Sequence, residues 1–303
     1  MKILVTGGAG FIGSHLADRL IEDGHEVVII DNLSAGRVEY VNPKSKFYKI
    51  DMNDAKITSI FNKEKPSVVY HLAFNTDVPR AVRDPLYDIM SLTGSLNVLE
   101  NSYKSGVSRL IFTSSGFIYG NAGVIPTGET TSFQSVSPYA ISKFAVEQYL
   151  KFYGNSRGLP YVILRLATVY GPRQVGQAMA DYIRKLSEGK QAELYGRNKK
   201  TRDYVYVMDV IEALLLCLNF KPDESIDPVF NVGTGVETPL RELYSRIAKI
   251  LSKKNSPIFM PERQGELQRF SLDYSKIKKA MGWKPKYNID VGLKETLKSK
   301  RLI

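Results

Sequence analysis

The sequence predicts an α/β protein with a doubly wound parallel sheet and a smaller, mostly C-terminal lobe. In the first half of the 303 residues, apolar β-branched runs alternate with helical stretches, and a glycine-rich turn follows the first run directly. Nearly continuous Val, Ile and Leu runs are typical of parallel strands that helices cover on both faces. After Tyr170-Gly171-Pro172 the alternation loosens, and Pro257, Pro261 and Pro285 interrupt the C-terminal part.

The first half supplies the elements of the main sheet in chain order. We expect a strand over residues 2–6 and then a helix from about Gly13, with Leu16 and Leu20 on its apolar face and Gly24 as its end. Further buried strands are expected over residues 26–31, 47–50, 67–73, 109–115 and 161–168. The second half predicts helices near 176–188, 208–220 and 239–252 and short strands at 203–207 and 229–232.

Composition excludes several classes of protein. Hydrophobic residues make up 43% of the chain, enough for a sizeable core, and no apolar run is long enough for a membrane span. The single cysteine, Cys217, lies in an apolar run, so we expect no intrachain disulfide. The glycine-rich turn follows Met1 too closely for a signal peptide. Together these features predict a cytosolic protein.

The net charge of +11 raises the question of nucleic-acid binding. The basic residues are scattered, however. Their densest cluster, Lys276, Lys278 and Lys279, lies on a predicted helix, where a solvated face explains it. A cleft for anionic small molecules explains part of the excess equally well. We therefore expect a small anionic ligand and no nucleic acid, membrane or metal.

The glycine-rich turn, Gly7-x-x-Gly10-x-x-Gly13, follows a strand and opens a helix. In that setting glycines permit a tight turn, and a pyrophosphate can then approach the backbone at the helix N-terminus. The spacing differs from the more usual GxGxxG, and a turn that merely needs glycine is the alternative. The β-α-β context favours a dinucleotide site.

Acidic residues end the second and third predicted strands. Asp31 can accept hydrogen bonds from the adenosine ribose and would repel a 2′-phosphate, which favours NAD over NADP. Arg37 is near enough in sequence to leave NADP open. Asp51-Met52 could flank the adenine, or could be an ordinary loop. We accordingly expect an NAD-binding Rossmann domain over 1–172, with returning segments near 203–233, and a ligand-binding lobe over 173–202 and 234–303.

Tyr139 and Lys143 are predicted to share one face of a helix that ends near Gly154, because they are four residues apart. Ser137-Pro138 is a typical helix start. A free tyrosine, with a pKa of about 10, is a poor base, and a neighbouring ammonium lowers that pKa. Ser115 ends a buried strand at the edge where a ligand must bind, so its hydroxyl can reach the reacting oxygen. Tyr-x-x-x-Lys alone is common in ordinary helices, but the three residues together predict hydride transfer at a carbinol carbon.

Over nearly its whole length the chain resembles the extended short-chain dehydrogenase/reductases, within the nucleotide-sugar epimerase and dehydratase group and nearest to its UDP-glucose 4-epimerases. The resemblance rests on the TGGAGFIGSHL start, Val28 to Leu33, Tyr70-His71-Leu72-Ala73, Ser114-Ser115 with Tyr119-Gly120, Tyr139-x-x-x-Lys143, Val169 to Arg173, Arg202 to Val207, and Leu272-Asp273 through Gly282-Trp283-Lys284-Pro285. It implies transient oxidation at C4 of a UDP-sugar, interconverting UDP-glucose and UDP-galactose.

The resemblance also implies a role for each site residue. Tyr139 would take the proton of the sugar 4-hydroxyl, Lys143 would hold the tyrosine anionic and bind the nicotinamide ribose, and Ser115 would bridge to the 4-oxygen. Residues implied in cofactor binding, besides Tyr139 and Lys143, are Gly7, Gly10, Phe11, Ile12, Gly13, Asp31, Asn32, Asp51, Met52, Leu72 and Ala73. Residues implied in substrate binding, besides Ser115 and Tyr139, are Thr168, Tyr195, Arg202, Arg263, Glu266 and Phe270.

Within that group of enzymes, the sugar side of this sequence is unusual. The 4,6-dehydratases and decarboxylases carry an acid just after the Ser115 strand, where this chain has Gly116-Phe117, so we disfavour both reactions. Phe74, Ser91 and Thr168 also depart from common residues. The large Phe270 stands where residue size limits the turning of a 2-N-acetyl sugar, so non-acetylated UDP-sugars are expected.

Two other functions stay open. An NAD-dependent dehydrogenase of the same fold would leave Arg202 and Arg263 unexplained, and a non-enzymatic nucleotide sensor would not need Ser115, Tyr139 and Lys143.

By resemblance, helices near 86–104 and 138–153 form a four-helix homodimer interface. The apolar residues expected there are Leu86, Ile89, Leu92, Leu96, Leu99, Phe144, Tyr149, Leu150 and Phe152.

Overall fold

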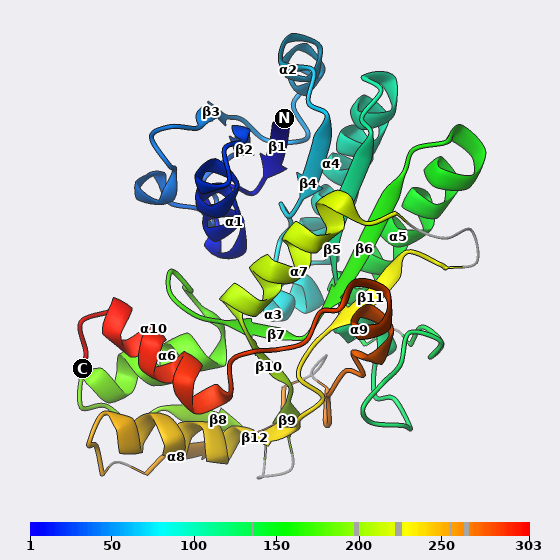
Figure 1. Cartoon of the computed structure of the whole chain (residues 1–303). Helices are drawn as coiled ribbons and strands as arrows, with labels where there is room; N and C mark the ends of the chain where they lie inside the picture. The colour runs from blue at the N-terminus through cyan, green and yellow to red at the C-terminus, as the bar shows by residue number, and fades with distance from the viewer. Residues whose placement is uncertain (135, 197–199, 222–225, 255, 264–266) are drawn as a thin grey trace.

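The computed structural model describes residues 1–134, 136–196, 200–221, 226–254, 256–263 and 267–303. Its centre is a seven-stranded sheet in which all neighbouring strands are parallel (Figure 1). The spatial order is β11 (Val229–Val232), β6 (Tyr161–Leu166), β5 (Arg109–Ser115), β4 (Val68–His71), β1 (Lys2–Thr6), β2 (Glu26–Asp31) and β3 (Lys46–Lys49). The predicted doubly wound parallel sheet is therefore confirmed.

The strand order reverses direction at β1. The chain runs from β1 outward through β2 to β3 and then crosses back, so that β4 pairs with the other side of β1. In open α/β sheets such a switch point opens a crevice beyond the carboxyl ends of the strands, where ligands bind. The glycine turn after β1 and the end of β4 both lie at this crevice.

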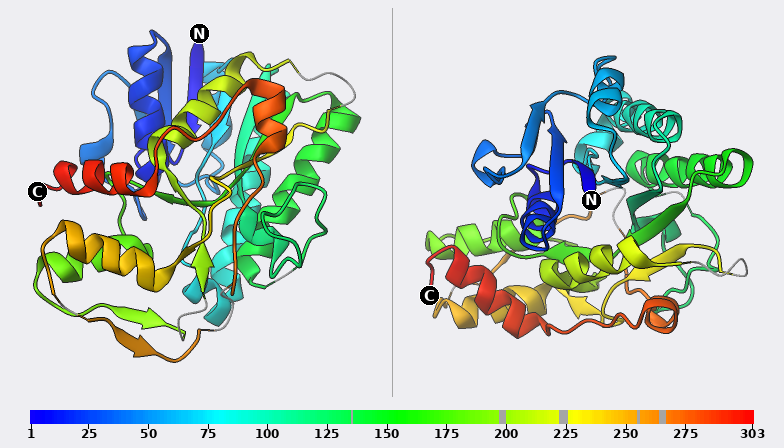
Figure 2. Two further views of the ribbon diagram at one scale, coloured as in Figure 1. Left: turned by 60° about the horizontal axis from the view of Figure 1, so that its bottom comes forward. Right: turned by 45° about the horizontal axis from the view of Figure 1, so that its top comes forward.

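Alternation along the strands builds two apolar layers, one on each face. Ile3, Val5 and Ile29 point to the layer that includes α1 (Phe11–Glu22) and α7 (Val207–Asn219). The alternate residues of the same strands, Leu4, Val28 and Ile30, point to the opposite layer. That layer contains apolar residues of α2 (Ile57–Glu64), α4 (Pro85–Lys104) and α5 (Pro138–Arg157). Figure 2 shows helices on both sides of the sheet. Burial of both faces explains why these strands read as nearly continuous apolar runs.

The smaller lobe lies at the carboxyl side of the sheet and comes mainly from the C-terminal half (Figure 1). Three short two-stranded sheets belong to the second half: β7 (Thr168–Tyr170) with β10 (Tyr204–Tyr206), β9 (Thr201–Arg202) with β12 (Thr238–Pro239), and β8 (Glu193–Tyr195) with β13 (Ile258–Met260). Besides α7, the described helices of this half are α6 (Gln177–Ser187), α8 (Leu240–Ile250), α9 (Ser275–Met281) and α10 (Ile289–Ser299). The short α3 (Val78–Arg83) follows β4.

Two predicted boundaries were wrong. The strand expected over 161–168 is divided: β6 ends at Leu166, and β7 leaves the main sheet to pair with β10. The helix that holds Tyr139 continues past Gly154 and ends at Gly158, which adopts the left-handed conformation. Gly154 is needed for a different reason, because an added Cβ would overlap the Tyr161 ring.

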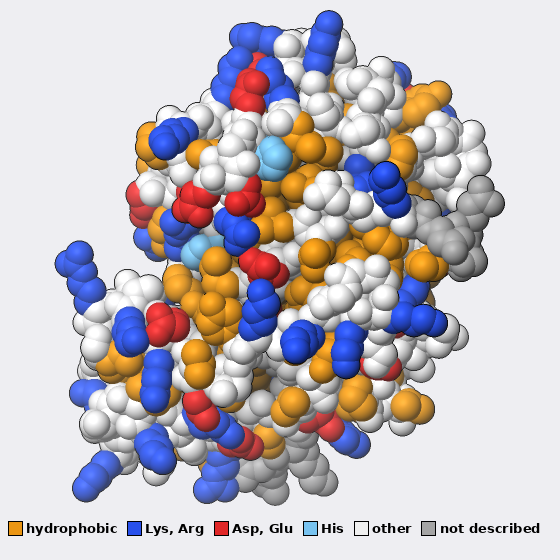
Figure 3. All heavy atoms as spheres, in the orientation of Figure 1, with side chains coloured by type: hydrophobic (Ala, Val, Ile, Leu, Met, Phe, Trp, Pro, Cys, Tyr) orange, Lys and Arg blue, Asp and Glu red, His pale blue; other side chains and the backbone are white. Residues whose placement is uncertain are grey.

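The surface carries mixed charge. Figure 3 shows Lys and Arg side chains scattered among acidic and apolar ones on the face drawn there. Among the described residues, no helix combines the length and apolar character that crossing a membrane requires.

Candidate active site

A cleft of about 980 Å³ opens at the carboxyl edge of the sheet and continues to the smaller lobe. Its walls include the glycine turn after β1, the ends of β4 and β5, and the first turns of α5. Across from these, residues of β8, β9 and the segment after β13 complete the walls. The sequence led us to expect a ligand where the two lobes meet, and the cleft lies there.

Backbone geometry closes the glycine turn tightly. Gly7 has a φ of +72°, and an added Cβ would lie 2.8 Å from the Ala73 nitrogen. At Gly13, an added Cβ would overlap the Gly7 carbonyl. Gly10, Phe11, Ile12 and Gly13 at the start of α1 line the cleft, so the N-terminus of this helix and the positive end of its dipole lie there. These features fit the pyrophosphate of a dinucleotide.

Asp31 is held at the end of β2 by the backbone. Its carboxylate accepts hydrogen bonds from the N–H groups of Ala9 (3.0 Å) and Leu33 (2.7 Å). Burial raises the pKa of Asp31, and these two hydrogen bonds oppose the rise. Arg37, which had kept NADP open, pairs instead with Glu39 at 3.3 Å and does not line the cleft.

The other residues expected to hold the cofactor also line the cleft: Gly7, Gly10, Phe11, Ile12, Gly13, Asn32, Asp51, Met52, Leu72 and Ala73. Asp51 accepts a hydrogen bond from the Asn32 amide at 2.6 Å, which joins the ends of β2 and β3. The structure therefore brings the predicted set together along one side of the cleft.

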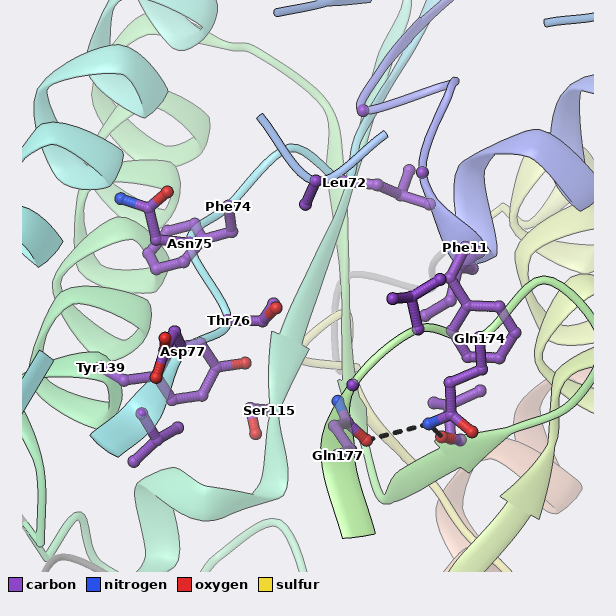
Figure 4. Close-up of a pocket in the computed structure, with 18 of the residues that line it drawn as sticks. Phe11, Leu72, Phe74, Asn75, Thr76, Asp77, Ser115, Tyr139, Gln174 and Gln177 are labelled. Carbon is purple, nitrogen blue, oxygen red and sulfur yellow. Dashed lines mark hydrogen bonds between the residues drawn. The ribbon is translucent and has the colours of Figure 1, made fainter. Parts of the chain in front are cut away.

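The predicted helix start positions Tyr139. Ser137 accepts a hydrogen bond from the Ala140 N–H at 3.3 Å, and Pro138 occupies the first turn. Tyr139 and Lys143 both line the cleft, and the Lys143 ammonium donates to the Thr113 carbonyl of β5 at 2.7 Å. Ser115 ends the same strand, and Figure 4 shows Ser115 and Tyr139 beside the same part of the cleft.

Burial dominates the electrostatics of this pair. It raises the pKa of Tyr139 to about 12, against the lowering effect of a hydrogen bond with Ser115. Burial also lowers the pKa of Lys143 to about 7, while the negative charges of Asp88 and Glu147 raise it. We had expected the lysine to lower the pKa of the tyrosine. In the structure the opposing effect on the Tyr139 pKa comes from Ser115 and not from Lys143. Lys143, with a pKa of about 7, changes its protonation state near neutral pH.

The residues expected on the substrate side meet across the cleft. Thr168, Tyr195, Arg202 and Arg263 all line it. Arg202 donates to the carbonyls of Thr201 (2.7 Å) and Leu267 (2.9 Å), which fixes its guanidinium. The guanidinium of Arg263 lies 3.3 Å from the Tyr195 ring centroid. The buried Thr168 hydroxyl has no hydrogen-bond partner among the described residues.

Phe270 and Glu266 differ from this group. Phe270 is buried and does not line the cleft; it packs edge-on behind Phe117, with ring centroids 5.4 Å apart, and Phe117 forms the wall. Any effect of Phe270 on the sugar would therefore act through Phe117. Glu266 lies outside the described residues.

Some residues of the site were not predicted from the sequence. Phe74, noticed only as an unusual residue after His71-Leu72-Ala73, packs edge-on against Tyr139 at 5.8 Å. Its ring centroid lies 3.9 Å from the Lys143 ammonium. Gln174 and Gln177 line the opposite wall and share a hydrogen bond of 3.1 Å (Figure 4). The size of Phe74 was a usable signal, whereas nothing in the sequence marked the glutamines.

Comparison with known proteins decides the family. The family model described as the NAD dependent epimerase/dehydratase family matches residues 3–233. The chain belongs to this family. It is 39% identical to the UDP-glucose 4-epimerase of Mycolicibacterium smegmatis, over 98% of this chain and 97% of the relative.

Solved structures of the family agree with the whole fold. A UDP-glucose 4-epimerase of Thermotoga maritima with UDP-glucose superimposes with a TM-score of 0.95 at 41% identity, and each chain is covered to 99%. A UDP-glucose 4-epimerase of Thermus thermophilus in complex with NAD gives a TM-score of 0.92 at 38% identity, again with 99% of each chain covered.

Proposed function

We propose that this protein is an NAD-dependent UDP-sugar 4-epimerase, an isomerase that interconverts UDP-glucose and UDP-galactose. The observation that carries the proposal is the shared cleft: the glycine turn and Asp31, the trio Ser115, Tyr139 and Lys143, and Arg202 all line it. Full-length similarity to UDP-glucose 4-epimerases supports it.

Tyr139 is proposed as the group that moves the proton. Its phenolate oxygen takes the proton from the sugar 4-hydroxyl, and the resulting hydroxyl returns it after the 4-keto sugar has turned over in the cleft. Ser115 donates a hydrogen bond to the 4-oxygen and orients it. NAD, held by the glycine turn and Asp31, would supply the hydride acceptor and donor for C4. Lys143, as an ammonium, favours the anionic tyrosine and holds the nicotinamide ribose.

Arg202 and Arg263 are proposed to bind the diphosphate of the substrate. A guanidinium offers planar paired donors that suit phosphate oxygens. The backbone contacts of Arg202 hold it in place before a substrate arrives, which lowers the entropic cost of binding. Tyr195, beneath Arg263, is proposed to lie near the uracil. Thr168, with its unpaired hydroxyl, can donate to the substrate.

The packing around Gly116 argues against dehydratase or decarboxylase activity. Those reactions need an acid at Gly116 or Phe117, and a Cβ added at Gly116 would lie 2.7 Å from Phe270 and 2.9 Å from Leu272. An acidic side chain at Gly116 would therefore have to displace the buried Phe270 and Leu272, and Phe117 cannot donate or accept a proton.

We also propose the division of labour expected from the sequence. Residues 1–172, with returning segments near 203–233, would bind NAD, while 173–202 and 234–303 would bind the nucleotide-sugar. The position of β11 in the main sheet supports the return of that segment. The cytosol remains the expected location, since Cys217 is buried and unpaired.

A homodimer through α4 and α5 is proposed as well. These helices pack on each other, and the outer face exposes Leu86 (77%), Ile89, Tyr149 and Phe152. Leu99 and Leu150, which we had assigned to the interface, are fully buried in the core instead. Light scattering at micromolar concentration should give a dimer for the native chain and a monomer for Phe152→Glu. A monomeric native chain would refute the interface.

The test of the reaction is direct. Purified protein incubated with UDP-galactose and NAD should produce UDP-glucose, resolved by chromatography, without net formation of NADH. Stoichiometric NADH would instead identify a dehydrogenase. Binding of UDP-galactose without any product would identify a nucleotide-sugar sensor.

A further inference from the structure

Asp88 of α4 is a buried carboxylate without an evident structural use. Its residue is 1% exposed, and neither side-chain oxygen has a hydrogen-bond partner of good geometry in the described parts of the chain. Burying a carboxylate costs several kcal/mol unless it is paired or hydrogen-bonded. Buried polar groups without partners are rare enough that each one calls for an explanation.

The environment of Asp88 contains the two reactive groups of the cleft. Burial raises the pKa of Asp88, while the nearby Ser142 hydroxyl and the Lys143 ammonium lower it. The negative charge of Asp88 in turn raises the pKa of Lys143 and the pKa of Tyr139. The helix α4, which carries Asp88, packs directly on α5, which carries Tyr139 and Lys143 in its first turns.

Lys143 is surrounded by groups that provide little compensating charge. The rings of Phe74 and Phe112 lie 3.9 and 4.7 Å from its ammonium, and its hydrogen bond goes to the neutral Thr113 carbonyl. Without a negative partner, a buried lysine in such surroundings would lose its proton near neutral pH.

The other titratable groups near Lys143 have partners of their own, although the charge of Glu147 also raises the pKa of Lys143. Glu147, on the same helix, already pairs with Arg165 at 2.6 Å. His71 of β4 is buried, which lowers its pKa to about 3, and as a neutral ring it bonds to Thr6 and Ser95 at 2.8 Å each. Among the described residues, Asp88 is thus the carboxylate near Lys143 that is not neutralised by another cation.

We propose that Asp88 is a positioning residue of the reaction, whose buried negative charge keeps Lys143 protonated within its apolar surroundings. The inference rests on the proposed function. It gives the buried Asp88 carboxylate a function: its negative charge stabilises the ammonium form of Lys143, and that form favours an anionic Tyr139. Asp88 does not line the cleft and acts through Lys143.

The pH dependence follows from the signs of these interactions. The charge of Asp88 raises the pKa of Lys143, so its removal should lower that pKa further below about 7. Asp88 also raises the pKa of Tyr139, so its removal makes the tyrosine slightly easier to deprotonate. If Lys143 controls the reaction, the Asp88→Asn protein should lose activity at high pH and regain it at low pH.

The first experiment measures Lys143 directly. The protein is labelled with ¹³C-lysine, and the Cε signal of Lys143 is assigned as the one that the Lys143→Arg variant lacks. This signal is then titrated with pH by NMR in the native and Asp88→Asn proteins, with and without NAD. We expect the midpoint to fall by about one pH unit in Asp88→Asn. Glu100→Gln is the control, because it removes a partly exposed carboxylate from α4, the helix that carries Asp88. It should leave the midpoint of the Lys143 titration unchanged. An unchanged or raised midpoint in Asp88→Asn overturns the proposal.

The second experiment measures kcat/KM for UDP-galactose against pH. The alkaline limb should move downward by about one pH unit in Asp88→Asn, giving about tenfold less activity at pH 8 and near-native activity at pH 6. Asp88→Glu should restore most of the alkaline activity. A uniform loss at all pH values, with reduced thermal stability, would assign Asp88 a structural role instead. Absence of epimerase activity in every protein would refute the proposed function but leave the NMR test valid.

Discussion

At the cofactor end of the cleft the backbone forms the binding surface, whereas at the sugar end side chains from distant segments form it. Gly7, Gly13 and the anchored Asp31 depend on turn geometry within a short stretch of chain. Phe117 is backed by Phe270, and Arg202 is fixed by carbonyls of Thr201 and Leu267. The first kind of site is specified locally, while the second depends on how the whole lobe packs.

The strongest test of this comparison lies where the two ends meet. Tyr139→Phe removes the proton acceptor but keeps the ring that packs against Phe74, so kcat should fall by a factor of about 10² to 10⁴. NAD affinity and thermal stability should change little. Ser115→Ala should cost less, since it removes one hydrogen bond and not the base. Native activity in Tyr139→Phe would disprove the mechanism.

A change in the glycine turn should affect the cofactor end alone. Gly7→Ala places a Cβ against the Ala73 backbone at a φ of +72°, a strain of about 1–2 kcal/mol before the clash is counted. We expect NAD affinity to fall at least about tenfold, with a lower melting temperature. Gly24→Ala is the matched control, because Gly24 also has a positive φ but no neighbour within 4 Å of an added Cβ. Equal NAD affinity in both variants would contradict the proposal that the glycine turn binds the pyrophosphate of NAD.

Substrate choice should respond to the sugar end alone. Phe270→Ser should relax the Phe117 wall and raise the rate on UDP-N-acetyl sugars relative to UDP-glucose and UDP-galactose by about tenfold. Phe117→Thr should do the same without emptying the core position of Phe270. Rates on UDP-glucose, on UDP-galactose and on the N-acetyl form of each measure both effects. A native preference for the acetylated sugars would refute the pocket argument but not the chemistry.

The smallest expected effect concerns the choice between NAD and NADP. Asp31→Asn removes the charge that repels a 2′-phosphate and should improve NADP binding about fivefold, the equivalent of roughly 1 kcal/mol. Since burial raises the pKa of Asp31, discrimination in the native protein should also weaken as the pH falls toward that pKa. Fluorescence titration with both cofactors measures this, and equal native affinity for the two would show that Asp31 does not discriminate.

Sequence reasoning succeeded where local patterns control structure. The glycine turn, the Ser137-Pro138 helix start and the strand ending at Ser115 all depend on a few neighbouring residues, and each was found as expected. It failed where tertiary contacts decide. Gly154 looked like a helix end but is a packing site for Tyr161.

The role of individual side chains around the cleft was likewise beyond sequence reasoning. Phe270 matched a pocket position, yet only the packing shows Phe117 between it and the cleft. Asp88 matched no sequence pattern, because what marks it is a buried carboxylate without a well-aligned hydrogen-bond partner among the described residues. Such a property depends on every element that surrounds the residue.

The crowding at Gly116 links two properties that would otherwise vary independently. Phe270 and Leu272 fill the space that an acidic side chain would need. Gly116→Asp alone would therefore disturb the core before it could donate a proton, and Phe270 would have to become smaller first. A change of reaction type through Gly116 is therefore coupled, in this chain, to the packing that we expect to control sugar preference.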